Sequence, residues 1–312
     1  MTDRLPQLEE RLFLTDGGLE TTLVFHEGID LPDFAAFTLL ETEEGEEILR
    51  DYYRNYLRIA DAAQCGFILE APTWRASRDW GARRGLGVEA LHELNCKAIT
   101  LLKDLRDDAA RPEEVVVSGN VGPRGDGYVV TERMSAEDAL AYHRPQVHAF
   151  RAAGADMACA MTLGYPEEAI GIVRAAKEAS LPVAIGFTTE TDGTLPCGDK
   201  LASAVAAVDI ATDAYAAYFL VNCAHPDHFA DALDPGAAWT DRIRGVRANA
   251  SRRSHEELDE ADDLDAGDPK EFGRLHARLV TEHPQITIFG GCCGTDHRHV
   301  ALVAKSVLEQ PF

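Results

Sequence analysis

The sequence lacks the features that mark several large classes of protein. No apolar run approaches the roughly 18 residues that a membrane-spanning helix needs. Residues 1–6 do not combine a cationic segment with an apolar one, so we expect no secretory signal there and predict a cytoplasmic protein. Basic residues are few, with 30 Lys and Arg against 53 Asp and Glu and a net charge of −23. Because such a surface repels phosphate groups, we expect neither nucleic acid nor a membrane as a partner.

Motifs that carry other chemistries are also missing. The stretch 119–127 is rich in glycine but has neither the spacing of a dinucleotide-binding fingerprint nor the Lys-Ser/Thr ending of a phosphate-binding loop. No Ser-His-Asp order and no paired-carboxylate spacing stands out. The seven cysteines are odd in number and scattered, which does not suggest a disulfide framework. In reducing cytosol we expect them to be thiols, available for metal binding or catalysis.

The hydrophobic pattern predicts one domain over residues 1–312, because no Gly/Ser-rich, Pro-rich or low-complexity tract divides the chain. Apolar runs alternate eight times with segments of helical periodicity. The predicted strands are 12–16, 66–70, 114–119, 156–161, 182–187, 218–222, 242–248 and 285–289. The predicted helices are 43–64, 88–110, 136–153, 167–179, 200–212, 225–233, 269–283 and 296–308. This alternation predicts an α/β protein with a single (β/α)₈ TIM barrel, with an open doubly wound sheet as the alternative. We interpret the acidic stretch 256–268 as a solvated loop or helix, with a lid as the alternative.

Two adjacent cysteines end the last predicted strand. Cys292 and Cys293 are bracketed by Gly290, Gly291 and Gly294. Neighbouring strand residues point to opposite faces, so the two thiols reach one atom only where the alternation is broken, which glycine permits. Core cysteines or a disulfide between the neighbours are the alternatives. A metal site requires a third soft ligand.

Cys223 is the candidate for that ligand, because it closes the sixth predicted strand at the level where the pair closes the eighth. The chemistry of such barrels lies at the carboxyl ends of the strands, and alternate strands contribute to one layer. Three thiolates with one open position form a catalytic zinc site. His225 is the rival ligand, with the first turn of a helix as its simpler interpretation. We expect structural roles or surface positions for the remaining cysteines and for two histidines after the pair: Cys65, Cys96, Cys159, Cys197, His297 and His299.

A zinc ion with three thiolates is a weak Lewis acid, since the complex has a net charge of about −1. It suits a substrate sulfur, which it would deprotonate and keep nucleophilic. Attack on the methyl group of a sulfonium or quaternary ammonium donor is the natural reaction. A zinc hydrolase and a barrel with a structural zinc closed by His225 are the alternatives from other classes.

Three motifs resemble those of the homocysteine S-methyltransferase family: Asp16-Gly17-Gly18, Asn222-Cys223, and the segment 290–295. The resemblance extends over essentially the whole chain. It implies a zinc-dependent (β/α)₈ barrel that methylates homocysteine to methionine, with Cys223, Cys292 and Cys293 as ligands. The compact chain is similar to the S-methylmethionine-dependent enzymes, and we expect neither a long carboxyl-terminal extension nor a folate or cobalamin domain.

The resemblance also implies a pocket for an amino-acid substrate. Asp16 would accept hydrogen bonds from the amino group, and the amides of Gly17 and Gly18 would face the carboxylate. Thr73 would line the pocket, and Trp74 would present its π face to a cationic donor, with packing at the barrel rim as the alternative. Further candidates at strand ends are Glu70, Asn120, Met161, Asn222 and Asn249.

Met161 departs from the family pattern, in which a Glu-Thr pair is common at the end of the fourth strand. Losing an ionic partner for the substrate ammonium would cost roughly 2 to 5 kcal/mol of binding. Either Asp16, Glu70 or Glu190 compensates, or the acceptor is a different thiol. We therefore expect small-molecule partners, a thiol acceptor and a methyl donor, and a monomer or small homo-oligomer.

Overall fold

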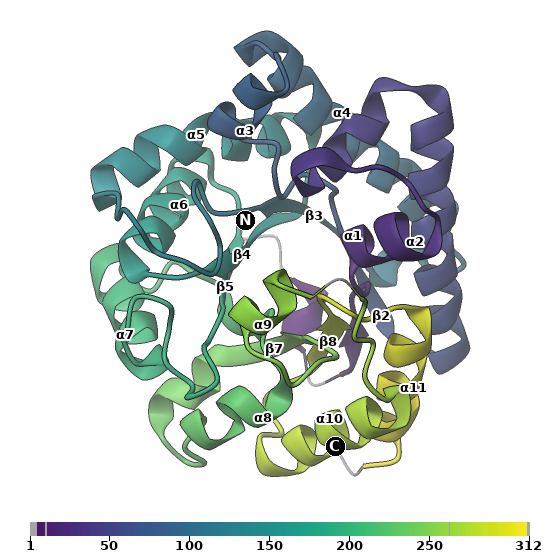
Figure 1. The fold of residues 1–312 in the computed structure, drawn as a ribbon, viewed down its shortest axis with the longest axis vertical. Coiled ribbons are helices and arrows are strands. Elements are labelled where there is room, and N and C mark those ends of the chain that lie inside the picture. Colours follow the sequence, from purple (N-terminus) through teal and green to yellow (C-terminus); the bar gives the residue numbers. More distant parts are fainter. Residues whose placement is uncertain (1–4, 10, 262, 311–312) are drawn as a thin grey trace.

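The computed structural model describes residues 5–9, 11–261 and 263–310. Residues 1–4, on which the expected lack of a secretory signal partly depends, and Asp262 of the acidic stretch lie outside the described residues. The strands form a closed parallel barrel in chain order, as predicted (Figure 1). They are β1 (Phe13–Leu14), β2 (Gly66–Glu70), β3 (Val115–Val121), β4 (Met157–Leu163), β5 (Val183–Phe187), β6 (Tyr218–Asn222), β7 (Ile243–Ala248) and β8 (Ile288–Gly291).

The longer helices surround the barrel (Figure 1). They are α2 (Glu43–Ala63), α4 (Val88–Asp107), α5 (Ala136–Ala153), α6 (Pro166–Ala179), α7 (Leu201–Thr212), α10 (Pro269–Glu282) and α11 (His297–Leu308). None of the helices in the described part of the chain has the length and apolar character that a bilayer crossing requires.

Continuous apolar strands fit this architecture because both faces of each strand are covered. Outward side chains such as Leu14 and Val117 pack against the helices in one large cluster. Inward side chains such as Phe13, Ile68 and Tyr218 fill the barrel. The barrel interior is therefore a packed core, and the space for chemistry lies at its end.

The sixth helix is the main departure from the predicted elements. A helix over 225–233 was expected, but α8 covers only Pro226–Phe229 and is followed by a 3₁₀ turn, Ala230–Ala232. Phe229 has φ −120° and ψ −12°, outside the helical range, and this break ends α8 before the 3₁₀ turn. The eighth strand covers Ile288–Gly291 where 285–289 was predicted, and because it ends two residues later, Cys292 follows it directly.

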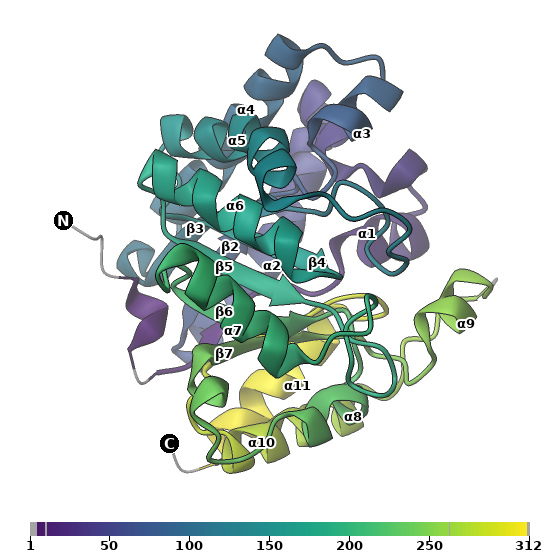
Figure 2. The same ribbon diagram turned by 90° about the vertical axis from the view of Figure 1, so that its left-hand side faces the viewer.

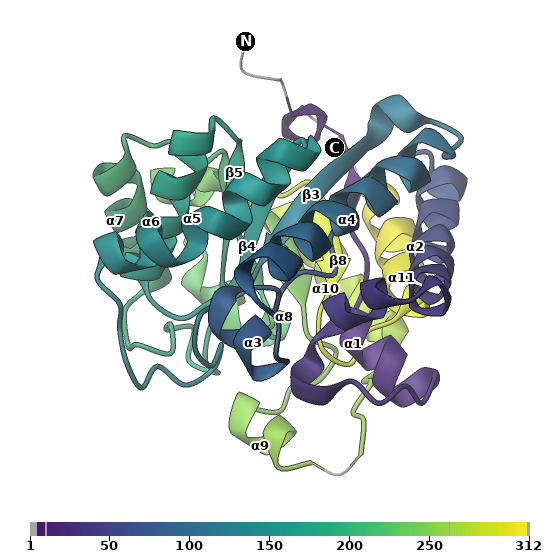
Figure 3. The same ribbon diagram turned by 90° about the horizontal axis from the view of Figure 1, so that it is seen from above.

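Three short helices lie at the end of the barrel opposite the chain termini (Figures 2 and 3). They are α1 (Leu19–Thr21), α3 (Arg78–Arg83) and α9 (His255–Asp259). α9 begins the acidic stretch and is fixed by a capping box between Ser254 and Glu257. The carboxyl ends of the strands point to this same end, where the predicted site residues follow them.

Candidate metal centre

The three predicted cysteine ligands meet at the carboxyl end of the barrel. Cys223 follows β6, and Cys292 and Cys293 follow β8. Their three Sγ atoms lie within 4.8 Å of one another, and no other such group of His, Cys, Asp or Glu ligands occurs among residues 5–9, 11–261 and 263–310. Three convergent sulfurs match the donor set of a zinc site with one open position.

Two of these sulfurs are joined in the structure, since Cys223 and Cys292 form a disulfide with a Cα–Cα distance of 5.4 Å. Cys293 is free and exposed. The expectation that all cysteines are thiols is therefore wrong for this pair, and the disulfide does not join the two neighbours. Because the thiolate is the metal ligand, this bond must be reduced before the triad can bind zinc.

Close backbone approaches explain the glycines beside the cysteines. A Cβ on Gly291 would lie 2.0 Å from Thr295 Oγ1, and one on Gly18 would lie 2.5 Å from Cys292 O. Gly294 has φ +78° and Cys223 has φ +53°, both in the left-handed region. Left-handed backbone costs little at glycine and more at other residues. At Cys223 it ends the strand and turns the chain where the sulfur joins the other two.

Asn249 ties the ligand segments together. Its Nδ2 donates to Cys223 O at 3.0 Å, and its Oδ1 accepts from Cys293 N at 3.1 Å. Thr188 Oγ1 donates to the same carbonyl at 3.2 Å, and His255 Nε2 lies 2.6 Å from it. Asn249, predicted to line the substrate pocket, thus positions two of the three cysteines.

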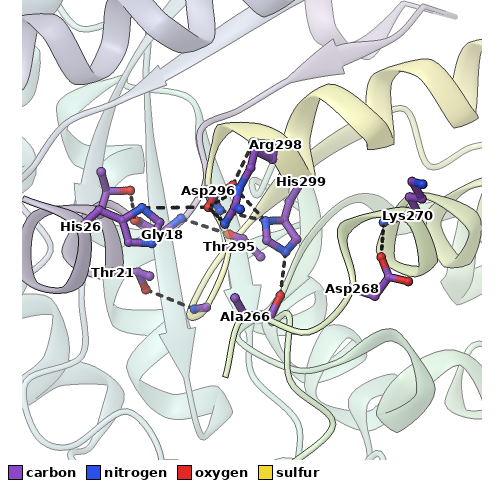
Figure 4. Close-up of polar contacts among 12 residues, drawn as sticks. Gly18, Thr21, His26, Ala266, Asp268, Lys270, Thr295, Asp296, Arg298 and His299 are labelled. Carbon is purple, nitrogen blue, oxygen red and sulfur yellow. Dashed lines mark hydrogen bonds and ion pairs between the residues drawn. The ribbon is translucent and has the colours of Figure 1, made fainter. Parts of the chain in front are cut away.

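The turn after β8 is anchored to the first βα connection and to α11 (Figure 4). Gly18 N donates to Thr295 Oγ1, and Gly294 N donates to Thr21 Oγ1, both at 3.1 Å. Asp296 caps α11 and accepts from Arg298.

His299 also belongs to this anchor. Its Nε2 lies 2.8 Å from Ala266 O, which links the turn to the end of the acidic stretch (Figure 4). The predicted surface position of His299 is wrong, because the ring is buried between Asp296 and that carbonyl. His297 is exposed, as predicted.

Asp16 already has charged and polar partners inside the protein. Arg247 Nη2 lies 2.7 Å from its Oδ1, and Tyr52 donates its hydroxyl to Oδ2 at 2.9 Å. The sequence interpretation missed Arg247, although an arginine between Val246 and Ala248 in an enclosed strand is unusual enough to indicate a buried ion pair. Asp16 thus pairs with Arg247 of the protein itself, whereas the resemblance implied that it binds the ammonium group of the substrate.

The amides of Gly17 and Gly18 were expected to face the substrate carboxylate. Gly18 N donates to Thr295, and a Cβ on Gly17 would lie 2.7 Å from Tyr56 Oη. The amide of Gly18 is therefore committed to the β8 turn, and Gly17 packs closely against Tyr56 of α2.

Glu70 lies in the barrel interior and is 4% exposed. Burial raises its pKa to about 7, and Arg247 opposes that shift. Glu70 Oε2 has no hydrogen-bond partner, whereas the Glu70 carbonyl accepts from Tyr53.

The remaining predicted pocket residues are held mostly by one another. Thr73 donates its hydroxyl to Asn120 O at 2.7 Å. Trp74 Nε1 donates to Met161 O at 3.3 Å, and the guanidinium of Arg75 lies 3.9 Å from the Trp74 ring centroid. One π face of Trp74, expected to receive a cationic donor, is thus covered by a resident cation.

Asn222 and His225 also have local partners. Asn222 accepts from Thr162 N and donates to Thr162 Oγ1, both at 2.9 Å. His225 caps α8, with its Nδ1 accepting from Asp227 N. Burial lowers the pKa of His225 to about 4, so the ring is neutral, but it is not part of the sulfur group.

Tyr128 was missed by the sequence interpretation. Its hydroxyl lies 3.5 Å from Cys223 Sγ and 3.7 Å from Cys293 Sγ, and its ring centroid is 4.3 Å from that of His255. The available signal was the glycine-rich stretch 119–127, which delivers the next residue to the site. Tyr128 and His255 therefore form one wall beside the sulfurs.

Comparisons with known proteins agree with this geometry. A model of the homocysteine S-methyltransferase family matches residues 13–307. Homocysteine S-methyltransferase of Escherichia coli (strain K12) is 30% identical over 165 residues, which make up 50% of this chain and 51% of that protein. The chain thus aligns with about half the length of this curated relative.

Solved structures of the homocysteine methyltransferase MmuM from Escherichia coli share the fold. The metallated form has a TM-score of 0.73 and the oxidized form 0.75; each is 22% identical, and the match covers 95% of this chain and 96% of MmuM. A match to the family model over nearly the whole chain decides the family. This protein belongs to the homocysteine S-methyltransferase family.

Proposed function

We propose that this protein is a zinc-dependent S-methyltransferase that moves a methyl group from a sulfonium or quaternary ammonium donor to a thiol. The favoured donor is S-methylmethionine-like, and the favoured acceptor is homocysteine, which gives methionine. Zinc would be held by Cys223, Cys292 and Cys293. The observation that carries the proposal is the convergence of these sulfurs within 4.8 Å at the carboxyl end of the barrel.

When bound, zinc supplies a positive charge that favours the thiolate form of the acceptor. The chain's own residues fix where that sulfur is placed. Asn249 holds Cys223 and Cys293 in one orientation through two hydrogen bonds. Tyr128 and His255 bound one side of the triad, which restricts the direction from which a donor methyl group reaches the acceptor sulfur. Departure of a neutral sulfide or amine completes the transfer.

A thiol other than homocysteine is the second candidate acceptor. Met161 is buried at the place where a Glu is common in the family, and Asp16 is neutralised by Arg247. Both features weaken recognition of an ammonium group. Glu190 lies 3.7 Å from His255 Nδ1, so it too has a partner already.

Hydrolysis and a purely structural zinc have less support. Either would be favoured by His225 as a fourth ligand or by a histidine-rich donor set. His225 instead accepts a backbone hydrogen bond as a helix cap, and all three candidate ligands are thiols.

The test begins with reduced, zinc-loaded protein. S-methylmethionine, S-adenosylmethionine, betaine and dimethylsulfoniopropionate are each paired with homocysteine and with other small thiols, and the methylated product is measured by mass spectrometry. We expect about one zinc per chain and methionine formation with S-methylmethionine. Zinc X-ray absorption should gain one sulfur scatterer when homocysteine is added.

Two results would count against the proposal. Zinc coordination that is unchanged by any thiol would indicate a closed structural site. Hydrolysis of a donor without methylation of a thiol would indicate the hydrolase.

The proposal also includes a cytoplasmic location, small molecules as the partners, and a monomer or small homo-oligomer.

A further inference from the structure

Arg75 is a buried cation with an unusual setting. It lies between β2 and α3, at the same end of the barrel as the cysteines. Its guanidinium carbon is 3.9 Å from the ring centroid of Trp74 and 3.7 Å from that of Trp80, so both faces of the group are covered. The residue is only 8% exposed. Stacking of this kind fixes the plane of the guanidinium and leaves only its edges for hydrogen bonding.

One edge of Arg75 is used and the other is free. Nη1 donates to Gly125 O at 3.1 Å. Nε is buried and has no hydrogen-bond partner, and Nη2 makes no hydrogen bond within the described part of the chain. No carboxylate among those residues pairs with it either. Nε and Nη2 are adjacent donors that match the two oxygens of a carboxylate.

Arg75 is linked to the sulfur triad through the loop that carries Tyr128, because its Nη1 donates to Gly125 O. Tyr128 and Glu20 interact electrostatically with both Arg75 and Cys293. The Tyr128 hydroxyl also contacts the Cys223 and Cys293 sulfurs directly. Burial raises the pKa of Glu20 to about 7, and Arg75 and Glu20 do not form an ion pair with each other in the structure.

Two other candidate groups for a substrate carboxylate already have partners inside the protein. Gly18 N donates to Thr295, and Arg247 pairs with Asp16. A buried guanidinium without an anionic partner is costly, since its desolvation is not repaid. Burial lowers the pKa of Arg75 to about 10, and the nearby Tyr128, Asp126 and Glu20 oppose that shift without forming an ion pair with Arg75.

We propose that Arg75 binds the carboxylate of the thiol acceptor through Nε and Nη2, a role that rests on the thiol methyl transfer proposed above. The acceptor is assigned rather than the donor because the methyl donor is itself a cation, and its charged centre is repelled by a guanidinium. One face of the Trp74 ring and one face of the Trp80 ring, which would attract such a cation, are already covered by Arg75. Arg75 is thus a specificity-determining residue that selects thiols with a carboxylate.

The test is equilibrium binding measured by calorimetry on reduced, zinc-loaded protein, which does not depend on turnover. The ligands are homocysteine, 4-mercaptobutanoate, which lacks the amino group, and 3-aminopropanethiol, which lacks the carboxylate. In Arg75→Gln we expect Kd to rise at least about 10-fold for the two carboxylates, because a paired, charged hydrogen bond is lost. Kd for 3-aminopropanethiol should stay within about twofold, because it never used that bond.

Two further variants guard against a trivial loss of structure. Arg75→Lys keeps the positive charge but loses the adjacent Nε and Nη2 donors. Its Kd values for the two carboxylate ligands should therefore lie between those of wild type and Arg75→Gln. Arg78→Gln, an exposed arginine three positions along the same segment, should match wild type with all three ligands. Zinc content and melting temperature are recorded for each variant.

The outcomes separate this role from the proposed function. Wild-type protein that binds none of the thiols would overturn both. Wild-type binding with the same three Kd values in Arg75→Gln would overturn only the role of Arg75. Equal weakening of all three ligands in both Arg75 variants would show a structural role instead. Weaker binding of S-methylmethionine with unchanged acceptor binding would place the donor's carboxylate on Arg75 and overturn the assignment to the acceptor.

Discussion

The two sides of the barrel mouth are built by different means. On the sulfur side, around β6 and β8, Cys223, Cys292 and Cys293 are placed by backbone turns and by a carbonyl–amide network centred on Asn249. On the opposite side, the connection after β2 places the cation of Arg75 by stacking it between two indole rings. The short cysteine side chain is positioned by its own backbone, whereas the long arginine side chain is positioned by the groups that pack on it. The positions of the three sulfurs are therefore set by the backbone, and the position of the Arg75 cation is set by side-chain packing.

The largest effect should come from breaking the sulfur side. In Cys292→Ser we expect zinc to fall from about one per chain to background. Methyl transfer should fall by at least about 1,000-fold, since the metal's contribution of several kcal/mol is lost. Metal analysis and product formation measure the two effects. Cys197→Ser, in a loop away from the triad, is the matched control and should keep both. A variant at Cys292 with full zinc would end the assignment of the ligand set.

The next largest effect concerns Glu70 on the charged side. Its pKa rises from 4.5 in the unfolded chain to about 7 in the folded protein, so the folded state binds the proton more tightly. The stabilising contribution is complete below pH 4.5 and is lost as pH rises through 7.

Glu70→Gln should therefore unfold with a free energy up to about 3 kcal/mol higher than wild type at pH 8, and with little difference at pH 4.5. Urea unfolding at both pH values measures it. A difference that is the same at the two pH values would mean that Glu70 does not titrate in this range.

A smaller effect should follow from removing the link between the ligand segments. Asn249→Ala loses hydrogen bonds to both Cys223 and Cys293, and we expect zinc affinity to fall about 10- to 100-fold. Thr188→Val loses one bond, to Cys223 only, and should lose less. Competition with a zinc chelator ranks the two. Equal losses would show that holding the two segments together is not what matters.

The sequence predicts the barrel and the cysteine triad better than it predicts the contacts of the buried charged groups. The barrel follows from alternating apolar and helical runs, and the triad follows from cysteines at the ends of β6 and β8 with glycines beside them. Cys292 and Cys293 are sequence neighbours, and only Cys223 had to be placed from the strand order.

The contacts of the buried charged groups and of His299 are not readable in this way. Arg247 meets Asp16 across 231 positions of the sequence, and no local pattern announces the pair. The stacking of Trp80 on Arg75 depends on how α3 folds back, which periodicity does not give. The burial of His299 depends on Ala266, in a loop without a repeating pattern.

The smallest predicted effect concerns Tyr128, which lies beside the sulfur triad. Tyr128→Phe removes only the hydroxyl near the Cys223 and Cys293 sulfurs and leaves the ring beside His255. One weak hydrogen bond to sulfur contributes about 0.5 to 1.5 kcal/mol, so zinc affinity should change no more than about tenfold. Tyr128→Ala also removes the ring and should weaken thiol binding further, because the wall between Arg75 and the triad is lost. Chelator competition and calorimetry separate these effects: if the two variants behave alike, the hydroxyl alone joins the sulfur side to the charged side.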